Sequence, residues 1–207
     1  MKRKRFGKEA GMLILIALII ISVAEVIFRA VIGTEAFTTA NYGELLIAII
    51  FAVIILIMTA KGKDRICYIL YSAWIAYFVL EKIYSLPARF AFLISNPENF
   101  VGVTPQIAQI TYIIGMLCII GIGVLLVEYM NDGTIYNKAF NTLCITAVIM
   151  LLIGIVLPLF DVLFNGYDFK YALVGFSNLH QSVMVYLMAF FAYDSAKLQL
   201  EKTKLTK

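Results

Sequence analysis

Apolar residues dominate six long stretches of the chain, and short polar or charged segments separate them. Each stretch has 18 residues or more, enough for a helix rising 1.5 Å per residue to cross most of a hydrocarbon layer about 30 Å thick. The stretches cover residues 11–32, 43–60, 66–86, 107–130, 139–160 and 172–193. The pattern predicts an all-α integral membrane protein, a compact bundle of about six transmembrane helices.

The connections between these stretches leave no room for a separate folded domain. We expect a basic N-terminal segment at 1–10, a membrane domain at 11–193 and a basic tail at 194–207. The longest connection, residues 87–106, contains three prolines and is predicted to be a loop outside the membrane. Its apolar beginning predicts a segment that lies in the interface or covers the bundle as a lid.

Composition supports the membrane prediction. The chain is 62% apolar and 14% charged, whereas soluble domains are about 45–50% apolar and about 25% charged. A mean hydropathy of +0.93 leaves too much apolar surface for a small soluble protein to bury. The composition excludes a soluble enzyme, a disordered chain and, despite a net charge of +4, a nucleic-acid-binding protein. We expect a multi-pass protein of the cell membrane, with the lipid bilayer as its surroundings.

Basic residues are distributed unevenly between the two predicted sides. Thirteen Lys and Arg residues fall on the side of the termini and four fall on the other. Because basic residues concentrate in cytoplasmic segments, both termini are predicted to be cytoplasmic. One alternative concerns the first stretch, where the apolar run 12–21 and the small residues 22–24 are typical of a cleaved signal peptide. The apolar pattern resumes at 26–28, which favours a span that is retained.

Polar residues within the spans concentrate in the half predicted to face outward. A charged group near the centre of a bilayer costs at least about 2.5–3.5 kcal/mol, so such residues are functional candidates. The candidate ligand-binding residues are Glu25, Arg29, Trp74, Tyr77, Glu81, Asp161, Asn178, His180 and Gln181.

Two of these groups have specific predicted arrangements. Glu25 and Arg29 are four residues apart on one helix face and are expected to pair. Glu81 shares a stripe with aromatic residues, including Trp74, an arrangement that suits a cationic or amphipathic ligand. Lys82 is expected to point away from this stripe and to extend its ammonium group toward the membrane surface.

His180, the one histidine, has two interpretations. Imidazole ionises near neutral pH, which suits a proton relay or a ligand contact, but the interpretation we favour is an interhelical hydrogen bond. A metal site would have to recruit Glu25, Glu81 or Asp161 around this single ring, so we expect neither a metal nor a cofactor. Motifs typical of nucleotide binding, zinc proteolysis and serine hydrolysis are absent from the sequence.

Glycine and proline in the spans predict local features of packing. Gly154 and Pro158 are one turn apart in the fifth span, which predicts a kink whose freed carbonyl is satisfied by neighbouring groups. Gly115, Gly121 and Gly123 predict close approach of other helices to the fourth span.

These observations support three hypotheses about function. The first is binding or transport of a small solute in the outward half. Six spans in about 200 residues resemble, in size, the substrate-capturing membrane subunits of vitamin importers. The second is a sensory or scaffolding module acting on a cytoplasmic protein partner through residues 194–202. The third is an intramembrane enzyme in which Glu25, Glu81, Asp161 or His180 act as acid–base groups.

Overall fold

The computed structural model describes residues 6–32, 39–95, 103–132, 137–167 and 178–192, and all secondary structure in these segments is helical. The helices are α1 (Phe6–Ile32), α2 (Thr39–Ala60), α3 (Asp64–Ser95), α4 (Val103–Asp132) and α5 (Asn137–Phe164). Residues 178–192 form a further helix, called the sixth helix below. The prediction of an all-helical chain with six helices is confirmed within this part of the chain.

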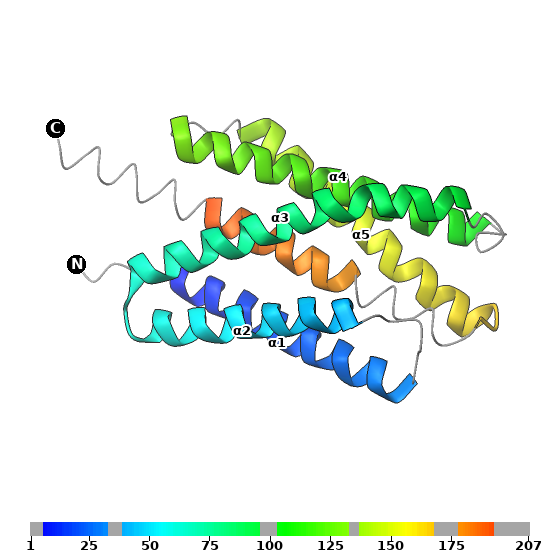
Figure 1. The fold of residues 1–207 in the computed structure, drawn as a ribbon, viewed down its shortest axis with the longest axis horizontal. Helices are drawn as coiled ribbons and strands as arrows, with labels where there is room; N and C mark the ends of the chain where they lie inside the picture. The colour runs from blue at the N-terminus through cyan, green and yellow to red at the C-terminus, as the bar shows by residue number, and fades with distance from the viewer. Residues whose placement is uncertain (1–5, 33–38, 96–102, 133–136, 168–177, 193–207) are drawn as a thin grey trace.

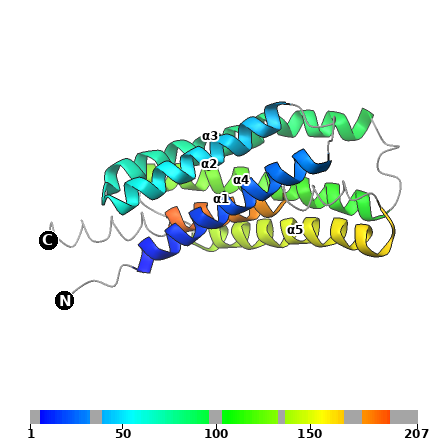
Figure 2. The same ribbon diagram turned by 90° about the horizontal axis from the view of Figure 1, so that it is seen from below.

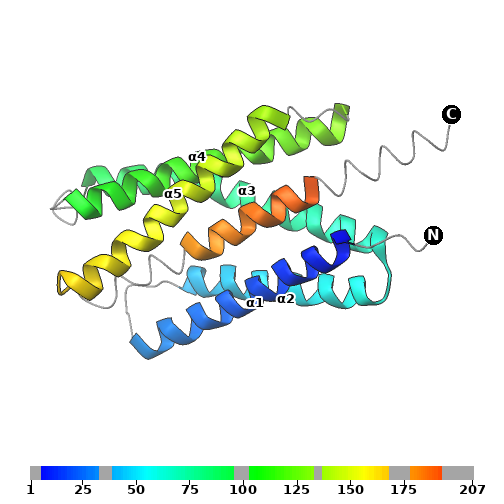
Figure 3. The same ribbon diagram turned by 180° about the vertical axis from the view of Figure 1, so that it is seen from behind.

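The helices run alternately in opposite directions and form an elongated bundle (Figures 1 and 2). We call the end at which α1, α3 and α5 begin the proximal end, and the end at which they finish the distal end. The sixth helix passes between α1 and α5 (Figure 3). Ten of its 15 residues are buried, and Tyr186 is its one exposed residue. It is therefore the central helix of the bundle.

The buried positions of α1 follow a regular spacing of four and three residues. They are Gly11, Leu15, Leu18, Ser22, Glu25 and Arg29. This spacing is a single helix face, which packs into the bundle. The opposite face exposes Leu13, Ile20 and Ile27. The inward face of α1 thus includes polar and charged residues, whereas its outward face is apolar, unlike that of a helix on a soluble protein.

Four stretches of the described helices are long and apolar enough to cross a membrane: Gly11–Val31, Arg65–Ala91, Gln109–Glu128 and Lys138–Phe164. In α2 the apolar stretch is shorter, Leu45–Ala60. This α-helix ends in a Schellman motif, in which Gly62 has a φ of 69°. The amide of Gly62 donates to the Thr59 carbonyl at 3.1 Å and that of Lys63 to the Met58 carbonyl at 3.0 Å. This motif produces the tight turn into α3 at the proximal end.

The prediction of a loop is wrong for residues 87–95 and 103–106, whereas residues 96–102 lie outside the described segments. Helix α3 continues through Pro87 to Ser95, and α4 begins at Val103. A proline removes one backbone donor, a loss that a helix in an apolar bundle tolerates when its other side chains pack well. Most of the expected lid is therefore an extension of two helices.

Glycines on α4 bring the neighbouring helices close, as predicted. A Cβ atom on Gly115 would lie 3.1 Å from the Leu151 side chain, and one on Gly121 would lie 3.1 Å from Leu143. On Gly123 it would lie only 2.6 Å from Val79 Cγ2. The first two contacts set the antiparallel register of α4 and α5, and the third sets the register of α4 and α3.

Substitution of Gly123 by Ala tests this packing. The added methyl group collides with Val79, whose branched side chain has little freedom to move, so we expect the free energy of unfolding to fall by about 1–3 kcal/mol. The matched control is Gly43→Ala, because a Cβ there meets nothing within 4 Å and alanine favours helix by up to about 1 kcal/mol. Unfolding in detergent measures both. Equal effects of the two substitutions would contradict the close approach of α3 and α4.

Candidate functional site

A hydrogen bond joins α1 to the sixth helix. His180 Nδ1 lies 3.2 Å from Ser22 Oγ, and both side chains are buried. The same two helices touch again toward the proximal end, where a Cβ on Gly11 would lie 2.7 Å from Phe190. The histidine thus forms an interhelical hydrogen bond, one of the two interpretations that the sequence allowed.

Two carboxamides join the sixth helix to α4 and α5. Gln181 Nε2 donates to Tyr112 Oη at 3.1 Å, and Asn178 Nδ2 donates to the Gly154 carbonyl at 2.9 Å. That carbonyl is the one freed by Pro158, since proline has no N–H for the residue four positions earlier. The predicted satisfaction of this carbonyl by neighbouring groups is therefore confirmed.

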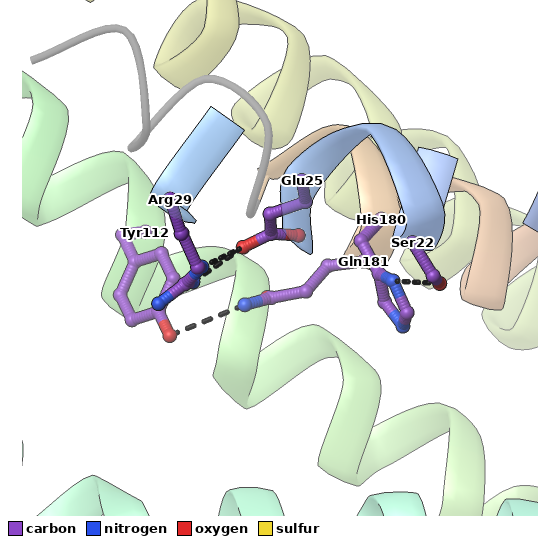
Figure 4. Close-up of polar contacts among 6 residues, drawn as sticks. All are labelled: Ser22, Glu25, Arg29, Tyr112, His180 and Gln181. Atoms are coloured by element: carbon purple, nitrogen blue, oxygen red, sulfur yellow. Dashed lines mark hydrogen bonds and ion pairs between the residues drawn. The ribbon is translucent and has the colours of Figure 1, made fainter. Parts of the chain in front are cut away.

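These contacts lie at one level of the bundle. Tyr112 is one turn distal to Gly115 on α4, and Gly154 is one turn distal to Leu151 on α5. Because Gly115 meets Leu151, the two positions face each other across the α4–α5 seam. We call the residues at this level the polar tier: Ser22, Tyr112, Asn178, His180 and Gln181. Figure 4 shows that Ser22, Tyr112, His180 and Gln181 reach toward one another from three helices.

The third helix contacts the polar tier through Arg89. Its Nη2 donates to Gln109 Oε1 at 2.6 Å, and its guanidinium carbon lies 5.1 Å from the centroid of the Tyr112 ring. Tyr112 therefore contacts α3 through its ring face and the sixth helix through its hydroxyl group. Arg89 lies in the segment that the sequence predicted to be a loop, and its partners on α4 anchor the extension of α3.

Glu25 and Arg29 form the predicted ion pair on α1. Their exposed fractions are 1% and 5%, and both Nε and Nη2 of Arg29 donate to Glu25 Oε1, the former at 3.1 Å. The two residues lie one and two turns distal to Ser22, and their side chains extend into the space beside Gln181 (Figure 4). The pair contributes no net charge, which makes its burial less costly.

The structure places Glu81 and Lys82 differently from the prediction. Lys82 is 3% exposed, with Nζ 2.5 Å from Glu81 Oε2 and 4.9 Å from the centroid of the Phe78 ring. The expectation that Lys82 reaches the membrane surface is wrong, because the longer α3 puts this residue near mid-helix. The sequence suggested that a cationic ligand would lie against the aromatic residues beside Glu81. In the structure, the ammonium group of Lys82 occupies that position, over the ring of Phe78.

Glu81 also lies at a different level from the polar tier. Val79 meets Gly123, so Glu81 is level with Gly121 in the antiparallel register of α3 and α4. Gly121 is nine residues from Tyr112, a separation of about 13 Å along α4. Glu81 and the polar tier are therefore two distinct features of the interior.

Three other candidate residues lie outside the polar tier. Trp74 is buried in the apolar core, where its ring stacks on Phe51 at 5.9 Å between centroids. Tyr77 faces outward and is 39% exposed. Asp161 is buried two turns distal to Gly154 on α5, where it accepts a hydrogen bond from Asn165 at 2.7 Å. Of the nine candidates, the structure groups Glu25, Arg29, Asn178, His180 and Gln181 in one region.

Sequence reasoning missed two members of the tier. Ser22 has a signal that could have found it, because it is a polar residue three positions before Glu25 on the same helix face. Tyr112 has none, because its contact with Gln181 depends on which helices are neighbours.

No group of three or more His, Cys, Asp or Glu residues in the described segments is arranged to hold a metal ion. No known protein family model matches the chain, and no curated protein or solved structure matches it. The chemistry of the polar tier is therefore the basis on which a function can be assigned.

Neutralising Glu25 tests the energetic importance of the ion pair. Glu25→Gln leaves a buried guanidinium group without its carboxylate, so we expect a loss of about 3–5 kcal/mol in the free energy of unfolding. The double variant Glu25→Gln, Arg29→Leu removes both charges and should recover much of that loss. The control is Glu128→Gln, which neutralises an exposed carboxylate and should change stability by about 0.5 kcal/mol or less. Equal effects of Glu25→Gln and Glu128→Gln would rule out a stabilising pair.

Proposed function

We propose that the protein is a multi-pass protein of the cell membrane whose six helices cross the bilayer, with the proximal end in the cytoplasm. The apolar outward faces of the helices support the membrane location. The described basic residues at the proximal end are exposed: Lys61, Lys63, Arg65 and Lys138. Three others, Arg29 and Arg89 toward the distal end and Lys82 near mid-helix, are buried or half-buried against other groups. This asymmetry supports a cytoplasmic proximal end.

Cysteine labelling tests the orientation. In a variant whose three native cysteines are replaced by serine, we introduce Lys63→Cys at the proximal end or Asn165→Cys at the distal end, both at exposed positions. A membrane-impermeant maleimide added to intact cells should label Cys at 165 and not at 63, and permeabilisation should make both reactive. The opposite pattern in intact cells would reverse the orientation.

We infer that the function of the polar tier is to bind or transport a small polar solute. The observation that carries this inference is the convergence of five polar side chains at one level, with an ion pair beside them. Much of the interior elsewhere is filled by an apolar cluster, which shows that the bundle can pack without such groups. Polar groups at membrane depth are costly, and their concentration in one place is typical of a ligand pathway.

The other two hypotheses have less support. The segment expected to contact a cytoplasmic partner, residues 194–202, lies outside the described residues, so that hypothesis stays a prediction. An acid–base enzyme would use Glu25, Glu81, Asp161 or His180. Of these, Glu25 is held in an ion pair by Arg29. Glu81 is about 13 Å along the bundle from the tier, and Asp161 is about 10 Å distal to it by helix rise, so these residues do not form one catalytic group.

Ligand-dependent thermal stability tests the proposed function. We expect at least one member of a panel of amino acids, amines, carboxylates, sugars and amides to raise the melting temperature of the purified protein, because a ligand stabilises the folded state that binds it. Tyr112→Phe removes the hydroxyl group that contacts Gln181 and should reduce the shift.

The control variant for this experiment is Thr142→Ala. The Thr142 hydroxyl group is exposed near the proximal end and donates only to the Lys138 carbonyl, at 2.8 Å. The shift should therefore be unchanged in this variant. Absence of any shift across the panel, or an equal shift in Tyr112→Phe and the unsubstituted protein, would contradict a solute site at the polar tier.

A further inference from the structure

Two carboxamides of the sixth helix have a buried oxygen without a hydrogen-bond partner. Asn178 and Gln181 are 0% and 4% exposed, and each uses its NH₂ group in a contact with another helix. Within the described part of the chain, neither Asn178 Oδ1 nor Gln181 Oε1 receives a hydrogen bond. A buried acceptor without a donor is destabilising, and such atoms are rare in folded proteins unless a ligand or water satisfies them.

Chemistry fixes the orientation of the Asn178 amide. The Gly154 carbonyl can only accept, so the NH₂ group must face it and Oδ1 must be the open atom. Pro158 leaves this carbonyl without its helical donor. The missing side chain of Gly154 provides the space, since a Cβ there would lie 2.6 Å from Asn178 Nδ2. Three residues thus combine to hold one amide with its oxygen unsatisfied.

The two open oxygens belong to one region of the tier. Asn178 and Gln181 are three residues apart and therefore lie on the same face of the sixth helix. Their partners, Gly154 and Tyr112, are level with each other across the α4–α5 seam. The two carboxamides therefore lie beside each other at one level of this seam.

The charges around the tier argue against an ionic ligand. Arg29 is paired with Glu25, and Arg89 lies over the ring of Tyr112, so two guanidinium groups and one carboxylate are near this seam. This balance disfavours a cation. The open atoms are carbonyl oxygens, which repel an anion. A neutral molecule with N–H donors fits both conditions.

We propose that the polar tier selects a neutral solute with N–H donors, such as a lactam, a cyclic urea or an unsubstituted carboxamide, and that Asn178 and Gln181 accept its hydrogen bonds. The proposal rests on the solute-binding function above and adds the chemical class. Tyr112 belongs to the same set of contacts. Its hydroxyl group accepts from Gln181 and can donate its own hydrogen to the carbonyl oxygen of such a solute.

The test compares two probes: 2-imidazolidinone, which has two N–H groups, and its N,N′-dimethyl derivative, in which methyl groups replace both N–H hydrogens. Binding to the purified full-length protein is measured by thermal stability over millimolar concentrations of each probe. We expect 2-imidazolidinone to bind at least tenfold more tightly than the dimethyl compound. Equal binding of the two compounds would overturn the proposal.

Variants at Gln181 locate the selectivity. Gln181→Met preserves length and removes the acceptor, so the preference for 2-imidazolidinone should fall at least tenfold. Gln181→Glu retains an acceptor, and the Tyr112 hydroxyl group can donate to it, so this variant should fold and keep the preference. The control is Ser182→Ala, because that hydroxyl group donates to the Asn178 backbone carbonyl of its own helix at 2.9 Å. Retention of the full preference in a folded Gln181→Met protein would also overturn the proposal.

The solute panel distinguishes failure of the proposed ligand class from failure of the solute site itself. A charged or donor-free solute that binds in a Tyr112-dependent way, while 2-imidazolidinone does not bind, would leave the solute site standing and overturn the ligand class. Absence of binding by every compound would overturn both.

Discussion

The sixth helix is enclosed by the other helices, and its polar side chains must find their partners inside the protein. This constraint determines the arrangement of the distal half. Ser22 on α1, Tyr112 on α4 and the Gly154 carbonyl on α5 each receive one contact from this helix. Because these partners are at one level, the same contacts that hold the helices in register also concentrate polar atoms in one place. Structural support and the candidate binding site are therefore made of the same hydrogen bonds.

The sequence predicted those parts of the structure that depend on a single helix. Helix number, the pairing of Glu25 with Arg29, and the need of the Gly154 carbonyl for an outside donor all follow from local spacing and from the chemistry of proline. The close approach at Gly115, Gly121 and Gly123 was also predictable, because glycine leaves room for a neighbour whichever helix that neighbour is. Residues of the candidate site were predicted where a polar or charged side chain interrupts an otherwise apolar span.

The predictions were wrong or incomplete where they depended on the position of a helix end or on which helices are neighbours. The predicted end of the third span at residue 86 placed Lys82 near a helix end, whereas α3 continues to Ser95, more than three turns beyond Lys82. The same assumption grouped Glu81 with His180, although the Val79–Gly123 contact separates their levels. Tyr112 could not be assigned to the site because its role requires α4 to lie beside the sixth helix. Such adjacency is a property of the whole bundle and has no signal in a local pattern.

The two ion pairs differ from the hydrogen bonds of the tier in one respect that affects biogenesis. Glu25 and Arg29 lie on one helix, and so do Glu81 and Lys82, so each pair can form as soon as its own helix forms. For a membrane protein, these four charges can then enter the bilayer already paired, before any helix has found its neighbours. The bonds of His180, Gln181 and Asn178 all require a second helix, and the helix that carries them is the last of the six to be synthesised. The charges of these two pairs can thus be neutralised within their own helices, whereas the polar tier is completed only when the sixth helix docks.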